Sequence, residues 1–359
     1  MIHDCIIIGG GLAGLSAANR LVDLGIKPLV IESGDYPSHK VCGEFYSPEC
    51  IKYLNEWGIV PPVKINKIKF IAQSSTFDMN LDTPAGGISR ALCDFLLMQR
   101  ASKLGATILT HTKVVHLTAP DSSQQNYELK LSTGALLQAH QIIIATGRYS
   151  LFAQQYLQQS HEPIKFIGIK THFDGIDLGD QLTMYAFKNI YLGHAPIEDG
   201  KINVSCLARI DDVRRAGNAS AYMSQLLAGK DAHVLSQTLK SGKQLFDWIT
   251  CSAPRFGKRK LPVWPHAYII GDAAGAITPA CGDGLAMAIT SGHMIGNYVL
   301  HKQSQEFQQD WNKRYTQRLK WGIGLHEIML RPLCSSTMIN VCALFPSIPN
   351  FLLHATREI

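Results

Sequence analysis

The alternation of apolar and polar positions predicts a regular unit at the start of the chain. Residues 2–8 form a short apolar run, which is typical of a buried parallel strand. Apolar positions over 12–25 recur with helical spacing, and Gly25 is a candidate C-cap. Residues 28–31 predict a second strand, which ends at Glu32. The chain is therefore expected to open with a strand–helix–strand unit.

The rest of the chain mixes both periodicities. Helices are expected at 47–57, 89–104, 219–240 and 284–300. Strands are expected within 64–82 and 164–210 and at 106–117, 127–138, 142–145 and 267–270. The alternating runs inside 164–210 indicate an antiparallel sheet. The last sixty residues are expected to be mostly helical, and the apolar stretch Met338–Leu353 is interrupted by Pro346 and Pro349.

Composition narrows the class of protein. The chain has 359 residues, of which 46% are hydrophobic and 17% charged, and its formal net charge is +6. Lys and Arg are dense only at 255–260, which disfavours a nucleic-acid binder. The chain has nine cysteines, an odd number, so they cannot all pair with one another, and no C-x-x-C motif is present. This pattern indicates free thiols in a reducing compartment. No signal peptide and no uninterrupted apolar stretch of about 18 residues is visible, so a cytoplasmic location is expected.

The first chemical motif lies where the first strand meets the first helix. Gly9-x-Gly11-x-x-Gly14 has the spacing that permits a tight turn, a close backbone approach to a pyrophosphate and close helix packing. Glu32 follows 18 residues after Gly14 and can accept hydrogen bonds from ribose hydroxyls. An acid at this place favours FAD or NAD over NADP. The alternative is an ordinary glycine-rich turn.

A second motif favours FAD over NAD. An apolar strand ends at Gly271-Asp272, and the carboxylate of Asp272 could hold ribityl hydroxyls. The turn Gly282-Asp283-Gly284 then opens a helix, whose N–H groups would face the pyrimidine edge of a flavin. The alternative is a glycine-capped loop before a closely packed helix.

With both motifs the chain resembles the FAD-dependent oxidoreductases of the para-hydroxybenzoate hydroxylase or glutathione-reductase type, and most closely the geranylgeranyl reductase-like branch. Aromatic hydroxylases usually carry a His and a G-Q-G where this chain has Gly275 and Gly282-Asp283-Gly284. That departure disfavours a standard aromatic hydroxylase without excluding one. The resemblance covers roughly residues 1–300.

The resemblance implies an α/β (α+β two-domain) fold: a Rossmann-like FAD-binding domain of glutathione-reductase type, an inserted antiparallel-sheet substrate domain and a helical C-terminus. We assign 1–62, 85–150 and 260–302 to a discontinuous FAD-binding domain. We assign 63–84 and 151–259 to the substrate domain, and 303–359 to a C-terminal helical segment.

The motifs and the resemblance together give a set of candidate site residues. Those expected to bind FAD are Gly9, Gly11, Leu12, Ala13, Gly14, Glu32, Ser33, Cys42, Gly43, Arg90, Val115, Ala145, Thr146, Gly147, Gly271, Asp272, Pro279, Gly282, Asp283, Gly284 and Leu285. Cys42 and Glu44 are the catalytic candidates, because the Cys-Gly segment of the reductase branch lies near flavin and substrate. The alternatives are a buried filler for Cys42 and a helix-flanking charge for Glu44. No metal site is expected, since no His/Cys cluster is present.

Three functions stay open. The first is a reductase that delivers a flavin hydride to a double bond of a hydrophobic, isoprenoid- or polyketide-like substrate. The second is a single-component flavin monooxygenase that hydroxylates an aromatic or polyketide substrate, and the third is a non-catalytic flavin-binding redox sensor or assembly factor. A flavin halogenase is disfavoured, because no W-x-W-x-I-P segment is present. Only one dinucleotide fingerprint exists, so NAD(P)H would dock transiently as electron donor. A peripheral membrane contact, possible for the apolar C-terminus, is a further expectation.

Overall fold

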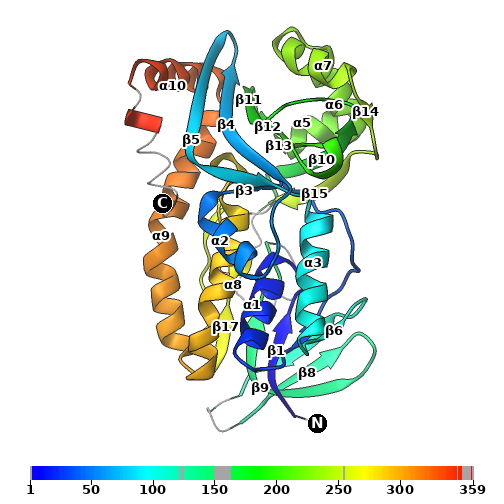
Figure 1. The fold of residues 1–359 in the computed structure, drawn as a ribbon, viewed down its shortest axis with the longest axis vertical. Helices are drawn as coiled ribbons and strands as arrows, with labels where there is room; N and C mark the ends of the chain where they lie inside the picture. The colour runs from blue at the N-terminus through cyan, green and yellow to red at the C-terminus, as the bar shows by residue number, and fades with distance from the viewer. Residues whose placement is uncertain are drawn as a thin grey trace.

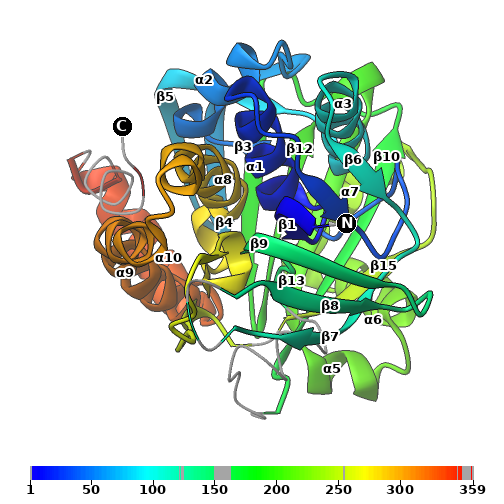
Figure 2. The same ribbon diagram turned by 90° about the horizontal axis from the view of Figure 1, so that it is seen from below.

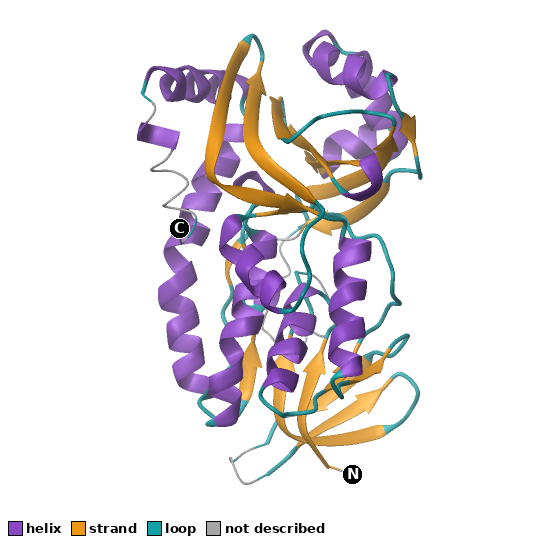
Figure 3. Ribbon diagram, viewed as in Figure 1, coloured by secondary structure: helices purple, strands orange, loops and turns teal. Residues whose placement is uncertain are grey.

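The computed structural model describes residues 2–120, 122, 125–148, 163–253, 255–345, 347–349 and 357. These residues form two large β-sheets with a layer of helices between and beside them (Figures 1 and 3). The seven-stranded sheet lies toward the end of the molecule that holds the N-terminus, and the nine-stranded sheet lies at the other end. The expected α/β two-domain fold class is therefore confirmed.

The seven-stranded sheet is built around the first apolar run. Its strands are β1 (Ile2–Ile8), β2 (Leu29–Ile31), β6 (Thr107–Leu109), β7 (Val114–Thr118), β8 (Tyr127–Leu131), β9 (Leu136–Ile144) and β17 (Ala267–Ile269). β1 pairs in parallel with β2 on one side and β9 on the other, and β17 continues the parallel sheet beside β9. The second half of β1 is buried. That burial explains its continuous apolar run, since a central parallel strand is covered on both faces.

Helices α1 (Leu12–Asp23), α3 (Arg90–Lys103) and α8 (Gly284–Leu300) gather on one side of β1, and β7 and β8 lie on the other (Figure 2). Small residues let α1 and α8 approach closely. A Cβ added to Gly292 would lie 2.5 Å from the carbonyl oxygen of Ala13, and one added to Gly296 would lie 2.7 Å from Cγ of Arg20. Gly292 and Gly296 of α8 are therefore packing residues for α1.

The nine-stranded sheet draws its strands from two separate stretches of the chain. They are β3 (Phe45–Tyr46), β4 (Val63–Ala72), β5 (Ser75–Gly87), β10 (Phe166–Asp174), β11 (Gln181–Phe187), β12 (Ile190–Pro196), β13 (Ile202–Arg209), β14 (Lys243–Gln244) and β15 (Ile249–Ala253). All its pairings are antiparallel except that of β11 with β4. Because the chain enters this sheet between strands of the other, residues distant in sequence meet where the two sheets face each other.

Smaller elements complete the two layers. Helices α5 (Ile210–Arg215), α6 (Ala219–Ala228) and α7 (His233–Lys240) pack on the nine-stranded sheet through one apolar cluster, which includes Met223 and Leu235. Helix α2 (Pro48–Glu56) begins after Ser47 as expected, and it packs against α8. The short strands β16 (Gly257–Lys258) and β18 (Gly275–Ala276) form a separate two-stranded pair.

Three expected elements were wrong in detail. The strands expected at 127–138 and 142–145 are instead a hairpin of β8 and the longer β9, because Gly134, with φ +88°, closes a turn between them. The helix expected at 219–240 divides at Gly229, where the backbone becomes extended. The strand expected at 106–117 divides into β6 and β7.

The C-terminal helices pack against both layers of the molecule. Helix α9 (Ser304–Met329) buries Phe307, Trp311 and Tyr315 in the cluster that also contains the central strands, and the Tyr315 hydroxyl lies 2.6 Å from that of Thr290 on α8. Helix α10 (Pro332–Leu344) packs on β4 and β5. The expected helical C-terminus is confirmed over these residues. No helix among the described residues is long and apolar enough to cross a bilayer.

Candidate functional site

The glycine motif after β1 adopts the geometry that its spacing predicts. Gly9 has φ +105°, and a Cβ there would lie 2.4 Å from the carbonyl oxygen of Ala145. A Cβ on Gly14 would lie 1.9 Å from the carbonyl oxygen of Gly9. Gly11 differs, because a Cβ there would meet only Nη2 of Arg90, at 3.9 Å. The backbone at Gly11 is therefore open to a ligand, while Gly9 and Gly14 serve the turn and the helix packing.

Glu32 stands at the end of β2 and is fixed beside this turn. Its Oε2 accepts a hydrogen bond from the Gly10 N–H at 2.7 Å, and its Oε1 accepts one from the Gly34 N–H at 2.9 Å. Lys40 Nζ lies 3.8 Å from Oε1. Ser33 is exposed beside it, and its hydroxyl lies 3.5 Å from Oε1. The carboxylate thus has a defined position next to the N-terminus of α1.

The second motif lies directly across from the first. A Cβ on Gly271, whose φ is +58°, would lie 2.8 Å from Cβ of Ala13 at the start of α1. Asp272 follows β17 and forms an ion pair with Arg148, Nε to Oδ2 at 3.1 Å. Burial raises the pKa of Asp272, and the charges of Arg148, Arg259 and Arg90 oppose that rise. Residues 9–14 and 271–284, far apart in sequence, therefore meet at one place.

The first turn of α8 offers open backbone N–H groups. Its N-cap Asp283 makes no side-chain capping bond, and only Ile277, at 3.8 Å, lies within 4 Å of a Cβ built on Gly284. Gly282 has φ +70°. An uncapped helix N-terminus with the positive end of its dipole suits an electron-rich acceptor.

A cavity of about 340 Å³ connects these turns. The sequence-predicted residues on its wall are Gly11, Leu12, Ala13, Cys42, Gly43, Glu44, Arg90, Ala145, Gly147, Asp272, Pro279, Gly282, Gly284 and Leu285. The predicted residues that do not line it are Gly9, Gly14, Glu32, Ser33, Val115, Thr146, Gly271 and Asp283. Most of this second group lies one residue away from the wall or in a supporting turn. Val115 is the exception, since it is 48% exposed on β7, and its contact with adenine stays a prediction.

The far wall of the cavity is apolar. It is formed by the inner face of the nine-stranded sheet and by the C-terminal helices, through Ile68, Phe70, Phe77, Met79, Leu182, Met184, Leu207, Leu325, Met338 and Ile339. One space thus joins a polar, glycine-lined end to a hydrophobic end. That combination is typical of a site that holds a polar cofactor and an apolar substrate together.

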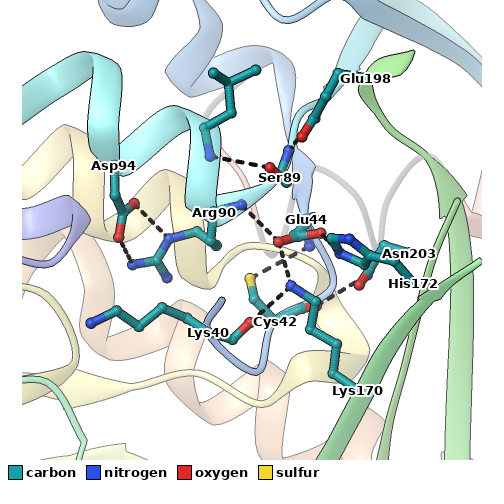
Figure 4. A network of polar contacts seen from close by, with 11 residues as sticks. Lys40, Cys42, Glu44, Ser89, Arg90, Asp94, Lys170, His172, Glu198 and Asn203 are labelled. Carbon is teal, nitrogen blue, oxygen red and sulfur yellow. Dashed lines mark hydrogen bonds and ion pairs between the residues drawn. The ribbon is translucent and has the colours of Figure 1, made fainter. Parts of the chain in front are cut away.

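Between the two ends lies a buried charged network centred on Glu44 (Figure 4). Oε1 of Glu44 accepts hydrogen bonds from the Arg90 N–H at 2.7 Å and from Nζ of Lys170 at 2.5 Å. Its Oε2 lies 2.7 Å from Nε2 of His172. Lys170 Nζ also donates to the carbonyl oxygen of Lys40 at 3.0 Å. The network therefore ties the 40–44 loop to α3 on one side and to β10 on the other.

The surroundings of Glu44 stabilise its ionised carboxylate. Its side chain and that of Lys170 are fully buried, and burial alone would raise the pKa of the carboxyl. Hydrogen bonds and charge from His172 and Lys170 outweigh that effect and lower its pKa. Glu44 therefore stays ionised and acts here as an anchor for the loop.

Cys42 faces the cavity from the same loop. Its sulfur accepts a long hydrogen bond from the Glu44 N–H at 3.5 Å, and Asn203 Nδ2 donates to its carbonyl oxygen at 3.0 Å. Burial raises the pKa of the Cys42 thiol, although the nearby Arg90 charge opposes this. The thiol therefore stays protonated, unlike the low-pKa thiolate of a nucleophilic cysteine. All nine cysteines of the chain are free, as expected.

The sequence reasoning missed several residues of the site. Lys170, His172 and Asn203 lie on β10 and β13, and Arg148 and Arg357 flank the cavity. One signal was present: Lys170 and His172 are ionisable residues at alternating positions of a strand whose first four residues, Phe166–Ile169, carry no polar side chain. Such residues point to one face, and a buried face can hold them only with partners.

The residues present fit FAD. The open backbone at Gly11 and the uncapped first turns of α1 and α8 supply donors for a phosphate and for a flavin edge. Glu32 and Asp272 supply acceptors for hydroxyl groups. The Thr146 hydroxyl is buried without a partner among the described residues, next to the cavity residues Ala145 and Gly147. The described residues include no cluster of His, Cys, Asp and Glu suited to a metal ion.

Comparison with known proteins agrees with this geometry. Residues 3–154 match the model of the pyridine nucleotide-disulphide oxidoreductase family. The chain is 25% identical to the geranylgeranyl diphosphate reductase of Synechocystis sp., over 88% of this chain and 82% of that protein.

Solved structures share the fold. A geranylgeranyl bacteriochlorophyll reductase-like protein from Thermoplasma acidophilum superposes with a TM-score of 0.77 at 17% identity, over 100% of this chain and 92% of that one. The flavin-dependent brominase Bmp2 superposes with a TM-score of 0.82 at 14% identity, over 99% and 93%.

Proposed function

We propose that this chain, a member of the FAD-dependent oxidoreductase superfamily that includes geranylgeranyl reductase-like and para-hydroxybenzoate hydroxylase-like flavoproteins, is a reductase of carbon–carbon double bonds in a hydrophobic substrate. FAD, when bound and reduced, supplies the hydride. NAD(P)H is proposed as a transient electron donor, because the sequence holds a single dinucleotide fingerprint.

The observation that carries this proposal is the continuity of the cavity. Its polar end is formed by Gly11, Asp272 and Gly284, and its other end by the apolar face of the nine-stranded sheet. A long isoprenoid-like chain suits the second end, because its binding is driven by burial of apolar area. The relative from Synechocystis, which bears the name of a geranylgeranyl diphosphate reductase, supports an isoprenoid substrate.

The chain itself must supply a proton as well. Delivery of a hydride to one carbon of a double bond leaves the other carbon in need of a proton. Cys42 lies on the cavity wall with a protonated thiol, whereas Glu44 is held as an anion by its donors. We therefore propose Cys42 as the proton donor, and Glu44 as the residue that positions its loop.

Cofactor binding is assigned to the two helix N-termini. The first turn of α1 would hold the pyrophosphate, with Glu32 on the ribose hydroxyls. Asp272 would hold ribityl hydroxyls, and the first turn of α8 would face the flavin. Cys42 and Gly43 would then line the same cavity on the substrate side.

A flavin monooxygenase is the second candidate function. The fold is shared with the flavin-dependent brominase Bmp2, so this architecture is compatible with chemistry that uses oxygen. A mostly apolar cavity wall also suits a reaction that must exclude water. A redox sensor without turnover is the third candidate, since the proposed FAD contacts do not by themselves require catalysis.

Anaerobic mixing with NADH or NADPH separates these functions. A reductase is expected to lose its oxidised flavin absorbance with the nicotinamide alone, because its reduction needs no gating by substrate. A gated monooxygenase would bleach only when its substrate is also present. If neither nicotinamide bleached the flavin under either condition, the nicotinamide-driven reaction would be excluded.

A peripheral membrane contact is proposed for the outer face of α10. The inner face of this helix lines the cavity through Met338, Ile339 and Cys342. Its outer face exposes Leu333 (75%) and Leu344 (74%). The stretch from Pro332 to Phe345 carries no charged side chain. The exposed residues between these two leucines include Thr337 and Asn340, so the outer side is uncharged and mixed in polarity. A helix with one side on the substrate cavity and one uncharged side that exposes leucines suits uptake of a lipid-like substrate from a bilayer surface.

A further inference from the structure

Arg357, near the end of the chain, reaches the first turn of α8. Its Nε lies 2.7 Å from Oδ1 of Asp283, and its Nη2 donates to the carbonyl oxygen of Cys281 at 3.1 Å. The guanidinium lies over the ring of Phe45, 5.6 Å from its centroid. The two charged side chains are 3% and 0% exposed. A residue 74 positions away in sequence therefore completes the turn that opens α8.

This buried pair keeps unused hydrogen-bonding capacity. Nη1 of Arg357 and Oδ2 of Asp283 are both buried without a partner among the described residues. A buried donor on a charged group costs free energy when it stays unpaired. Other buried side-chain polar atoms also have no partner among the described residues, so the assignment of Arg357 depends on its place in the cavity wall.

The position of Arg357 shows where a ligand would lie. Arg357 lines the same cavity as Gly282 and Gly284. A Cβ added to Gly282 would lie 3.5 Å from Nη2, so the guanidinium rests against the turn itself. The first N–H groups of α8 and the Arg357 donor thus border one region of the cavity.

We infer that Arg357 is a cofactor-site residue, which presents a positive charge to the edge of the bound flavin at the start of α8. This inference rests on the proposed function, because it assumes that FAD occupies the cavity. A carboxylate at Asp283 would otherwise oppose the anionic charge of a reduced flavin edge. Arg357 lines the cavity beside the first turn of α8 and offsets that carboxylate.

The inference makes opposite predictions for the two partners. Arg357→Gln removes the positive charge, so we expect FAD to dissociate at least about tenfold more readily. We also expect the flavin midpoint potential to become more negative. Asp283→Asn removes the opposing negative charge and keeps Arg357, so we expect the potential to become more positive. Arg357→Lys keeps the charge but loses the planar guanidinium. The affinity of this variant for FAD should fall, while its flavin midpoint potential stays near that of the wild type.

The test titrates deflavinated wild-type protein and each variant with FAD and then measures the midpoint potential by spectroelectrochemistry. Arg331→Gln is the matched control, because Arg331 is an exposed arginine paired with Glu327, and we expect neither quantity to change. Should Arg357→Gln prove insoluble, Arg357→Lys and Asp283→Asn still decide the question through the potential.

Each outcome bears on a different claim. Opposite shifts in potential for Arg357→Gln and Asp283→Asn support the inference. Unchanged affinity and potential in Arg357→Gln would overturn it, and so would lower thermal stability with an unchanged potential, which is the signature of a purely structural pair. If the wild-type protein bound no FAD, the proposed function would fail, and the inference would fail with it.

Discussion

At the scale of single residues, the glycines of the first motif have distinct roles that their shared chemistry does not reveal. A Cβ built on Gly9 or Gly14 would lie within 2.4 Å of a backbone carbonyl oxygen, so both positions require glycine. Gly11 faces open space. The spacing of the motif predicted this division. Nothing in the sequence predicted that Arg357 would complete the second turn, because an isolated arginine near a chain end carries no pattern. Local motifs are therefore readable from sequence, and contacts between distant single residues are not.

Gly11→Glu is expected to fold normally and to lose FAD. The backbone of Gly11 has φ −79°, which any residue adopts, and its side-chain direction is open. A glutamate there would place a negative charge where the pyrophosphate should bind. Flavin content and melting temperature of the purified protein measure the two effects. Gly324→Glu is the control, since Gly324 is exposed on α9 with no atom within 4 Å of a built Cβ. Yellow Gly11→Glu protein would show that the site is misassigned.

Cys42→Ala is expected to keep FAD and to lose turnover by about a hundredfold or more, which is the usual effect of removing a general acid. Its thiol is protonated and faces the cavity, and an alanine keeps the backbone of the 40–44 loop. FAD content and turnover must be measured separately. Cys334→Ala on the exposed side of α10 is the control. Unchanged turnover in Cys42→Ala would remove Cys42 from the reaction.

At the scale of elements, apolar periodicity identified most helices and strands, and the errors have a common cause. The hairpin of β8 and β9 and the break at Gly229 both depend on glycine or extended backbone inside a continuous pattern. Periodicity shows which face of an element is buried, but it does not show where the chain turns. Periodicity also does not identify the partners of a buried polar residue. The burial of Lys170 is explained by Glu44 and the carbonyl oxygen of Lys40, which belong to another part of the chain.

Lys170→Met is expected to destabilise the fold by about 3–5 kcal/mol, because it leaves the buried Glu44 carboxylate without its cation. The double variant Glu44→Gln/Lys170→Met should recover part of that loss. Urea unfolding of both single variants and the double variant gives the coupling energy. Lys201→Met, at the exposed pair with Asp199, should cost less than about 1 kcal/mol. Additive effects at positions 44 and 170 would contradict the network.

A pH-dependent stability is expected from His194 on β12. Burial lowers its pKa from 6.5 to about 4, and its Nε2 lies 3.1 Å from the Tyr185 hydroxyl. Because the native pKa is depressed, the unfolded chain binds more protons between these values, and stability falls as the pH drops below about 6.5 toward 4.

His194→Gln should therefore reduce the loss of unfolding free energy between about pH 7 and about pH 5 by about 2 kcal/mol. Urea unfolding at both pH values measures it. An unaltered pH dependence in His194→Gln would show that this histidine is not buried as a neutral side chain.

At the scale of the whole molecule, the interleaving of two sheets makes the site. Segments that begin after β1 and after β17 reach one cavity because both strands run parallel to β9 in the seven-stranded sheet, and the nine-stranded sheet supplies the opposite wall. The two motifs made such a meeting predictable from sequence, since both had to contact one cofactor. An apolar wall was predictable from the sequence. The residues that form it were not, because they come from distant strands of the nine-stranded sheet and from the C-terminal helices.

The outer face of α10 leads to a prediction for the molecule as a whole. The protein is expected to cosediment with neutral phospholipid vesicles, and Leu344→Glu should lower the bound fraction by placing a charge on this face. Val263→Glu is the control, because Val263 is 79% exposed in the segment between β16 and β17, away from α10. Equal vesicle binding by both variants and the wild type would argue against α10 as the contact.

The central claim is that this flavoprotein reduces a double bond in an apolar substrate. Its most direct test mixes the reduced, FAD-loaded protein with a polyprenyl substrate in the absence of oxygen, while flavin absorbance and product mass are followed together. The account predicts that the oxidised flavin absorbance returns and that the product gains two hydrogens. Flavin that stays reduced until oxygen is admitted, with an oxygen atom then found in the product, would contradict the account and establish a monooxygenase.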